Sequence, residues 1–249
     1  SFVVAAAGGR VAKHGNRSVS SRSGSADFLQ AAGINIDLNP SQVADCIKNI
    51  GIGFMFAPKH HSAMKYAAGS RKALGLRTIF NILGPMTNPA GVERQLIGVY
   101  TKRLCAPMAE VLGSLGAQHV MVVHSEDGLD EISIAAPTDV AEYRKGSLSE
   151  YQLRPEDFFG ERQSLHGLAV ADSLQSLGIV KDALGARNGK QANAAGLMIA
   201  LNAGAALYVA GLADNIRDGF DTALEVIYSG LAKTKIDQLA NYTQAKKSM

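Results

Sequence analysis

A short basic segment near the start of the chain carries the clearest chemical signal. It reads Lys13-His14-Gly15-Asn16-Arg17-Ser18-Val19-Ser20-Ser21 and continues into Ser23-Gly24-Ser25-Ala26-Asp27. Lys13 and Arg17 supply fixed positive charge, and the serine hydroxyls add hydrogen-bond donors. Small residues let the backbone approach a ligand, and the positive end of a helix expected just beyond favours an anion. The segment predicts a phosphate site, with a solvated basic loop as the alternative.

A group of acidic side chains follows an apolar run at 119–124. Asp127, Asp130 and Glu131 lie in this acidic segment. In parallel α/β sheets, ligands bind beyond the carboxyl ends of the strands. Adjacent carboxylates there suit Mg²⁺, which prefers oxygen ligands and is often shared with substrate phosphates. Taken alone, the segment reads as an exposed acidic turn, but together with the basic segment it predicts magnesium–diphosphate chemistry.

A third candidate group lies on a helix expected over 60–74. It contains His60, His61, Lys65, Arg71 and Lys72. Arg71 has the planar fork of donors that binds a carboxylate through two bonds. Adjacent histidines point to different sides of a helix, so His60 and His61 make a poor metal pair. The alternative for this group is a solvated helix face.

The composition limits the classes of protein that fit. The 249 residues are 47% hydrophobic and 19% charged, which suits a globular protein with a full core. A net charge of +3 gives no reason to expect nucleic acid as a partner. Cys46 and Cys105 belong to no C-x-x-C pair, so we expect two reduced thiols in a cytoplasmic protein rather than a zinc site.

Two apolar stretches raise the question of a membrane or a leader. The stretch from Ala194 to Gly211 is roughly 18 residues, short of the ~20 that span a bilayer, and we expect a buried core helix. No membrane partner is predicted. The opening residues have neither an initiator Met nor a basic region, so they do not resemble a signal peptide. We expect a chain whose amino-terminal part is missing.

The elements that must position these groups alternate between strands and helices. Apolar runs at 96–100 and 119–124 flank a helix expected over 104–116, the arrangement of a βαβ crossover. The predicted class is α/β, a central and mostly parallel sheet flanked by helices. The remaining expectations are helices over 26–32 and 40–50, the second begun by Asn39, an extended run over 51–58, turns over 84–89, β-structure over 138–153 and helices from about 168 onward.

The motifs together resemble those of the anthranilate phosphoribosyltransferases. The resemblance rests on the basic segment, on Gly53-Phe54-Met55-Phe56-Ala57-Pro58 with His61 and Arg71, and on Arg77-Thr78-Ile79-Phe80-Asn81-Ile82-Leu83-Gly84-Pro85-Met86-Thr87-Asn88-Pro89. It is completed by Asp127-Gly128-Leu129-Asp130-Glu131. These motifs occur in order along essentially the whole chain, and the first and third are long and specific.

The resemblance implies a site as well as a fold. It implies a large α/β catalytic domain, here 1–58 and 76–249, and a small helical domain of which 59–75 is a part, usually in a homodimer with the active site in the cleft between domains. Phosphoribosyl diphosphate is expected at Lys13, His14, Gly15, Asn16, Arg17, Ser18, Val19, Ser20, Ser21 and Ser25. Anthranilate is expected at Asn16 and Arg71, with His14, His61 and Gly84 close by, and Mg²⁺ at Asp130 and Glu131.

The chain also departs from the family pattern. The family has a Gly-Thr-Gly-Gly-Asp diphosphate loop and an Asn-x-Ser-Thr stretch upstream of the first motif, and this sequence contains neither. Most of the helical domain is absent as well. We therefore expect this length of chain to be inactive by itself.

Two other functions remain as hypotheses from sequence. A pyrimidine nucleoside phosphorylase of the same broad fold would use phosphate as the nucleophile, but the His14-Gly15-Asn16-Arg17 stretch and Arg71 argue against it. A non-catalytic relative that binds nucleic acid would need a broad basic surface. The low net charge and the retained Asp130–Glu131 pair argue against that function.

Overall fold

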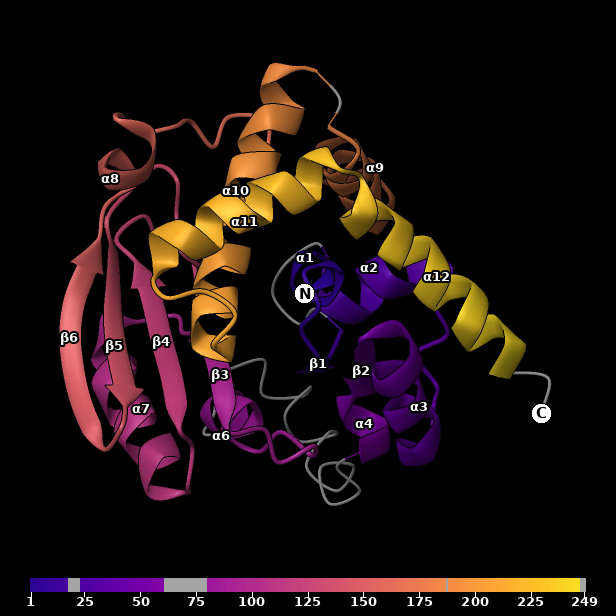
Figure 1. The fold of residues 1–249 in the computed structure, drawn as a ribbon, viewed down its shortest axis with the longest axis horizontal. Helices are drawn as coiled ribbons and strands as arrows, with labels where there is room; N and C mark the ends of the chain where they lie inside the picture. The colour runs from indigo at the N-terminus through magenta and orange to yellow at the C-terminus, as the bar shows by residue number, and fades with distance from the viewer. Residues whose placement is uncertain (18–22, 61–79, 187, 247–249) are drawn as a thin grey trace.

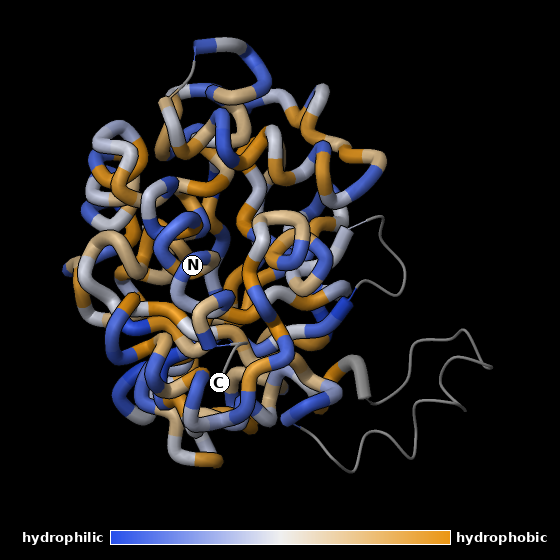
Figure 2. Tube along the Cα trace, turned by 90° about the vertical axis from the view of Figure 1, so that its right-hand side faces the viewer, coloured by the Kyte–Doolittle hydropathy of each residue, from blue (hydrophilic) through white to orange (hydrophobic). Residues whose placement is uncertain are grey.

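The computed structural model describes residues 1–17, 23–60, 80–186 and 188–246. In this part of the chain the strands form two sheets with helices packed around them, so the predicted α/β class is confirmed (Figure 1). Apolar segments run through the middle of the molecule and hydrophilic ones lie mostly at its periphery (Figure 2). The predicted division into large and small domains stays a prediction, because most of 59–75 lies outside the described residues.

The smaller sheet pairs β1 (Val11–Gly15) with β2 (Ile52–Phe56) in parallel. The chain enters it through α1 (Phe2–Ala6), and α2 (Ser25–Ala31) and α3 (Pro40–Ile50) connect the two strands. The Asn39 side chain caps α3 by accepting a bond from the Gln42 amide, and Gly51 ends the helix at a φ of 93°. These start and stop signals are local, and the predicted helix over 40–50 is confirmed.

The larger sheet has the order β3 (Arg94–Gly98), β4 (His119–Ser125), β5 (Thr138–Arg144) and β6 (Ser147–Leu153). β3 and β4 are parallel and are joined through η1 (Lys102–Leu104) and α7 (Cys105–Ser114), which confirms the predicted crossover. The β4–β5 and β5–β6 pairs are antiparallel. The α/β class holds, but instead of the expected single, mostly parallel sheet there are two sheets in the described residues, with parallel pairs at β1–β2 and β3–β4 and antiparallel pairs elsewhere.

Helices from the second half of the chain connect the two sheets. After α8 (Pro155–Phe159) come α9 (Ser173–Leu184), α10 (Lys190–Ala210), α11 (Ile216–Tyr228) and α12 (Leu231–Ala245). In Figure 1, α10 descends beside β3 and β4, and α12 runs diagonally across the α2–α3 side. Gly204 and Gly219 lie where α10 and α11 cross, and a Cβ on Gly219 would lie 2.3 Å from the Gly204 carbonyl oxygen. Only glycine permits so close a crossing.

The long helix α10 is a core helix, as the sequence predicted. Among the described residues it is the helix whose length and composition would suit a membrane span. Leu201 and Leu207 are fully buried in the main core, together with Ala200 and Ala205. Such burial is typical of the central helix of a folded domain.

A buried carboxylate joins three strands and α10. Glu142 accepts bonds of 2.7 Å from the hydroxyls of Tyr151 and Tyr208, and its Oε1 lies 2.7 Å from Nε2 of His119. Arg144 donates to the Tyr208 hydroxyl at 2.8 Å. Burial alone would raise the pKa of Glu142, but the bonds from His119, Tyr151 and Tyr208 hold it below its usual value. The cluster is structural and lies apart from the predicted site.

Three local predictions need correction. The run at 84–89 was expected as turns, but α6 (Phe80–Met86) continues through Pro85. Ile82 and Met86 pack against the core between the larger sheet and α7, so tertiary packing outweighs the local preference for a turn. The strand expected over 96–100 is β3 at 94–98. No strand was predicted for the basic segment, but Lys13 and His14 lie on β1, where the backbone pairs with β2.

Candidate active site

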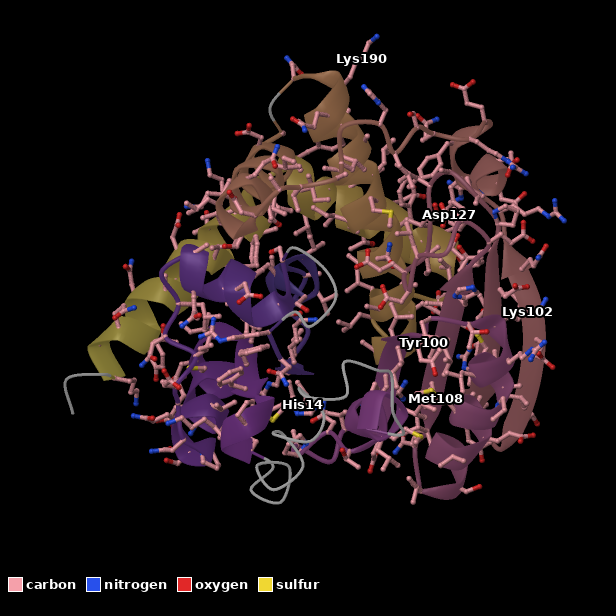
Figure 3. All side chains as sticks on the ribbon, turned by 180° about the vertical axis from the view of Figure 1, so that it is seen from behind. His14, Tyr100, Lys102, Met108, Asp127 and Lys190 are labelled. Carbon is pink, nitrogen blue, oxygen red and sulfur yellow. The ribbon has the colours of Figure 1, made fainter. Side chains whose placement is uncertain are left out.

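One cavity of about 2020 Å³ lies between the two sheets and is lined by most of the described candidate residues. β1 contributes from one side, and the segment after β4 contributes from the other. Figure 3 shows His14 on the β1 side and Asp127 on the side of the larger sheet. The candidate residues that line the cavity are Lys13, His14, Gly15, Asn16, Arg17, Ser25, His60, Gly84, Asp130 and Glu131.

Several candidate residues cannot be placed. Ser18, Val19, Ser20 and Ser21 of the basic segment lie outside the described residues, as do His61 and Arg71. The expected helix over 60–74 is described only at His60, the last residue of α4 (Ala57–His60).

Opposite charges influence each other across the cavity. Burial lowers the pKa of Lys13 below its usual range, and the nearby Glu131 carboxylate opposes that change. Burial raises the pKa of Glu131, the Asp130 carboxylate adds to the rise, and Lys13 opposes it. Protein atoms surround both side chains, yet both keep water-accessible surface because they face the cavity. The cavity therefore offers a cation for a phosphate and a carboxylate pair for a metal ion.

Arg17 is held by a neighbouring carboxylate. Its Nη1 lies 3.2 Å from Oδ1 of Asp27, and its guanidinium lies 5.7 Å from the centre of the Phe56 ring. The other oxygen of Asp27 accepts the Gly24 amide at 3.0 Å, which caps α2. The Asp27 carboxylate therefore already occupies part of the positive N-terminal end of α2, where a phosphate was expected from the sequence. The Arg17 side chain, half exposed, remains within reach of a ligand in the cavity.

The three candidate acidic residues after β4, Asp127, Asp130 and Glu131, have different surroundings. Asp127 accepts the Ser133 hydroxyl at 2.6 Å, so this carboxylate stiffens its own loop. Asp130 and Glu131 are exposed and line the cavity. The following residues, Ile132 and Ser133, are buried. Of these three residues, only Asp130 and Glu131 line the cavity.

Magnesium fits this pair in one particular way. No group of three or more His, Cys, Asp or Glu side chains suited to a metal is found among the described residues. The described residues therefore do not supply a complete set of protein ligands for a metal ion. Mg²⁺ commonly binds one or two carboxylates and takes its other ligands from water and substrate phosphates. Asp130 and Glu131 fit a magnesium ion that arrives with a phosphorylated substrate.

Three residues at the cavity were not singled out from the sequence. Asn88 donates through Nδ2 to the Ala12 carbonyl at 3.0 Å and ties the Asn-Pro turn to β1. Gly98, at the end of β3, leaves room for the Asp130 carbonyl. Asn202 bonds the backbone of Ile132 from α10. The one sequence signal was for Asn202, the single amide side chain in the Ala- and Gly-rich stretch from Ala194 to Gly211.

Comparison with known proteins agrees with this fold. The family model described as "Glycosyl transferase family, a/b domain" matches residues 1–233. An anthranilate phosphoribosyltransferase of Cellvibrio japonicus is 61% identical over 243 residues, which cover 98% of this chain and 71% of that relative. A Saccharophagus degradans enzyme of the same name is 60% identical over 242 residues, covering 97% of this chain and 71% of that relative.

Solved structures show the same likeness. The crystal structure of the Thermus thermophilus anthranilate phosphoribosyltransferase has a TM-score of 0.87 at 39% identity, covering 98% of this chain and 71% of that one. The Saccharomyces cerevisiae enzyme in complex with PRPP and Mg has a TM-score of 0.83 at 27% identity, covering 98% and 68%. The chain belongs to the anthranilate phosphoribosyltransferase family, within the glycosyl transferase class that its α/β domain defines.

Proposed function

We propose that the protein transfers the 5-phosphoribosyl group from phosphoribosyl diphosphate to anthranilate, giving N-(5-phosphoribosyl)anthranilate and diphosphate. This is the second step of tryptophan biosynthesis from chorismate. The observation that carries the proposal is the shared cavity, in which the basic segment from Lys13 to Arg17 faces the Asp130–Glu131 pair. Family membership supports the same reaction.

The cationic side of the cavity would hold the phosphoribosyl part of the donor. Lys13 and Arg17 supply charge-assisted bonds, and the Ser25 hydroxyl supplies a neutral one. The close pairing of β1 with β2 gives the Lys13 backbone a fixed position. A rigid support of this kind orients the sugar without a further entropic cost when the reaction occurs.

The acidic side would hold Mg²⁺ at Asp130 and Glu131. The yeast relative is known in a structure with PRPP and Mg, which supports the use of this metal here. Magnesium, when bound, neutralises charge on the diphosphate oxygens and so stabilises the leaving group. The carboxylates themselves exclude a free anion from that end of the cavity and fix which end of the donor binds there.

The nucleophile needs little help from the protein. The anthranilate nitrogen forms a bond to the anomeric carbon, the bond from that carbon to the diphosphate oxygen breaks, and the nitrogen loses one proton. An aromatic amine is already neutral at pH 7, so no strong general base is required. Alignment and charge neutralisation therefore supply the catalysis. Asn16 and Arg71, with His14, His61 and Gly84 nearby, are proposed to hold anthranilate.

We further propose that the protein is a cytoplasmic homodimer. The two buried thiols fit a reducing compartment, since burial raises the pKa of Cys46 and of Cys105 to about 11 and keeps both protonated. The dimer is proposed from the resemblance to the family, and analytical ultracentrifugation would test it.

The metal site is tested by the double variant Asp130→Asn with Glu131→Gln, made in the product of the complete coding region. Loss of both negative charges should weaken magnesium-dependent diphosphate binding and raise the magnesium concentration at half-maximal activity by at least ~10-fold. The matched control is Asp221→Asn with Glu225→Gln, which removes two exposed carboxylates from α11. If the Asp130→Asn, Glu131→Gln variant reached half-maximal activity at the same magnesium concentration as the wild-type protein, the assignment of the metal to these residues would be refuted.

A further inference from the structure

Asn202 lies where the central helix meets the acidic segment. It is near the middle of α10, between the buried residues Leu201 and Ala203, and it also lines the cavity. A polar amide in such an apolar helix is costly unless its donors and acceptor are bonded. We therefore expect the side-chain amide of Asn202 to have hydrogen-bond partners nearby.

The partners of Asn202 are the backbone groups of the residue that follows Glu131. The Ile132 amide donates to Oδ1 of Asn202 at 2.9 Å, and Nδ2 of Asn202 donates to the Ile132 carbonyl at 2.8 Å. The same Nδ2 donates to the Met198 carbonyl at 3.0 Å, one turn earlier in α10. The two bonds to Ile132 resemble one rung of a β-ladder, and the third fixes the side-chain rotamer.

The acidic pair is anchored on its other side as well. A Cβ on Gly98 would lie 1.5 Å from the Asp130 carbonyl oxygen, so the end of β3 fits closely against that backbone. The Ser133 amide donates to the Thr138 hydroxyl at 3.1 Å. Asp130 and Glu131 therefore extend from a backbone segment that is held at both ends, by Gly98 and by Asn202.

We propose that Asn202 is a positioning residue that fixes the Asp130–Glu131 backbone in the geometry that binds magnesium diphosphate. The inference rests on the proposed function for its choice of ligand. Asn202 acts through Ile132 and touches no reacting atom. Partners behind the ligands of a metal commonly control its affinity by fixing how those ligands point.

The first test measures the anchor itself. In Asn202→Ala, the Ile132 amide loses its acceptor, so hydrogen exchange in a peptide covering 126–134 should become several-fold faster in the absence of metal. Asn193→Ala is the matched control, since Asn193 is an exposed amide on the same helix and lies outside the cavity. The control should leave exchange in that peptide unchanged.

The second test measures the consequence for the ligand. Calorimetric titration gives the affinity for inorganic diphosphate with saturating magnesium and without magnesium. The magnesium-dependent gain is the ratio of these two affinities for diphosphate. It should fall roughly 10- to 100-fold in Asn202→Ala and stay at the wild-type value in Asn193→Ala.

A second variant separates geometry from charge and guards against misfolding. Asn202→Asp keeps an acceptor for the Ile132 amide, loses the bonds to the Ile132 and Met198 carbonyls and adds a negative charge. A charge effect alone would increase the magnesium-dependent gain, whereas displacement of the acidic pair would decrease it. A decrease in Asn202→Asp supports the positioning role, and an increase overturns it.

The remaining outcomes are equally decisive. If Asn202→Ala showed faster hydrogen exchange at 126–134 but an unchanged magnesium-dependent gain, Asn202 would be a purely structural residue and the proposal would be overturned. Unchanged hydrogen exchange in Asn202→Ala would also overturn it. A wild-type protein with no magnesium-dependent gain would also overturn it. A wild-type protein that shows the gain but does not consume anthranilate would refute the proposed transferase function alone.

Discussion

Replacing Gly98 by alanine puts a methyl group where the backbone of the acidic segment now lies. The added Cβ would be 1.5 Å from the Asp130 carbonyl oxygen and 2.5 Å from its carbonyl carbon. Real Cβ atoms essentially never approach a neighbour to less than 3.0 Å. Since both contacts are with backbone, no side-chain rotation can relieve them. Either β3 or the Asp130 segment must move.

The size of the movement follows from those distances. The oxygen must retreat by about 1.5 Å, the difference between 3.0 and 1.5 Å. A misplacement of about 1 Å can lower a rate ~100-fold, which corresponds to about 2.7 kcal/mol of transition-state stabilisation. Overpacking of this kind costs about 1–3 kcal/mol of folding stability, less than a typical domain has in total. We therefore expect Gly98→Ala to stay folded and to lose kcat/KM by roughly 100-fold.

The assay follows the loss of anthranilate fluorescence at several magnesium concentrations, in the product of the complete coding region. Gly98→Ala should also need more magnesium for half-maximal activity, because the displaced carboxylates no longer meet the ion together. Gly178→Ala is the control, because no atom lies within 4 Å of the added Cβ on α9. It should be slightly more stable, by up to ~1 kcal/mol, with unchanged kinetics.

One result would refute this reasoning. If Gly98→Ala retained wild-type kcat/KM and wild-type magnesium dependence, the position of the Asp130 backbone would not matter for catalysis. A variant that unfolds would be recognised by a reduced Tm in thermal denaturation. Its magnesium dependence would then be measured at a lower temperature, where the folded form predominates.

Two further predictions concern the substrate and the core. Arg71→Ala should raise the KM for anthranilate roughly 10-fold or more with little change in kcat, because it removes a charged contact remote from the breaking bond, and an unchanged KM in steady-state kinetics would count against that role. Glu142→Gln should lower the free energy of unfolding by about 2 kcal/mol at pH 7, because a neutral amide cannot accept bonds from His119, Tyr151 and Tyr208 through two oxygens. The pKa of Glu142 is held below the usual 4.5 in the folded protein, so this stabilisation is complete above that value and is lost as the pH falls through the folded pKa. Urea denaturation should show the difference between the two proteins shrinking as the pH falls below 4.5, and a constant difference would contradict the assignment.

Much of the local structure could be predicted because its signals lie close together in the chain. The amide of Asn39, the ring of Pro40 and the left-handed backbone of Gly51 delimit α3 within a dozen residues. The apolar run at 119–124 is the buried strand β4. The strand β3 begins two residues earlier than expected. The helix α6 was not predicted, because the packing of Ile82 and Met86 against the core outweighs the preference of Pro85 for a turn.

The sequence by itself determined the chemical types at the site and the family. Lys13 and Arg17 on one side, with Asp130 and Glu131 on the other, could be paired on charge alone as partners of a magnesium-bound diphosphate. Within each of these two groups the side chains lie close together in the chain. Their chemical type can therefore be recognised without knowing the fold.

Only the tertiary structure decided which of these groups share a cavity and what holds them there. Asn202 bonds Ile132 across 70 residues of sequence, and Gly98 at the end of β3 leaves room for the Asp130 carbonyl from the segment between β4 and β5. Asp127, which residue type alone could not distinguish from its acidic neighbours, bonds Ser133 within its own loop. These contacts depend on where separate elements cross, and that is set by the packing of the whole core rather than by any local pattern of residues.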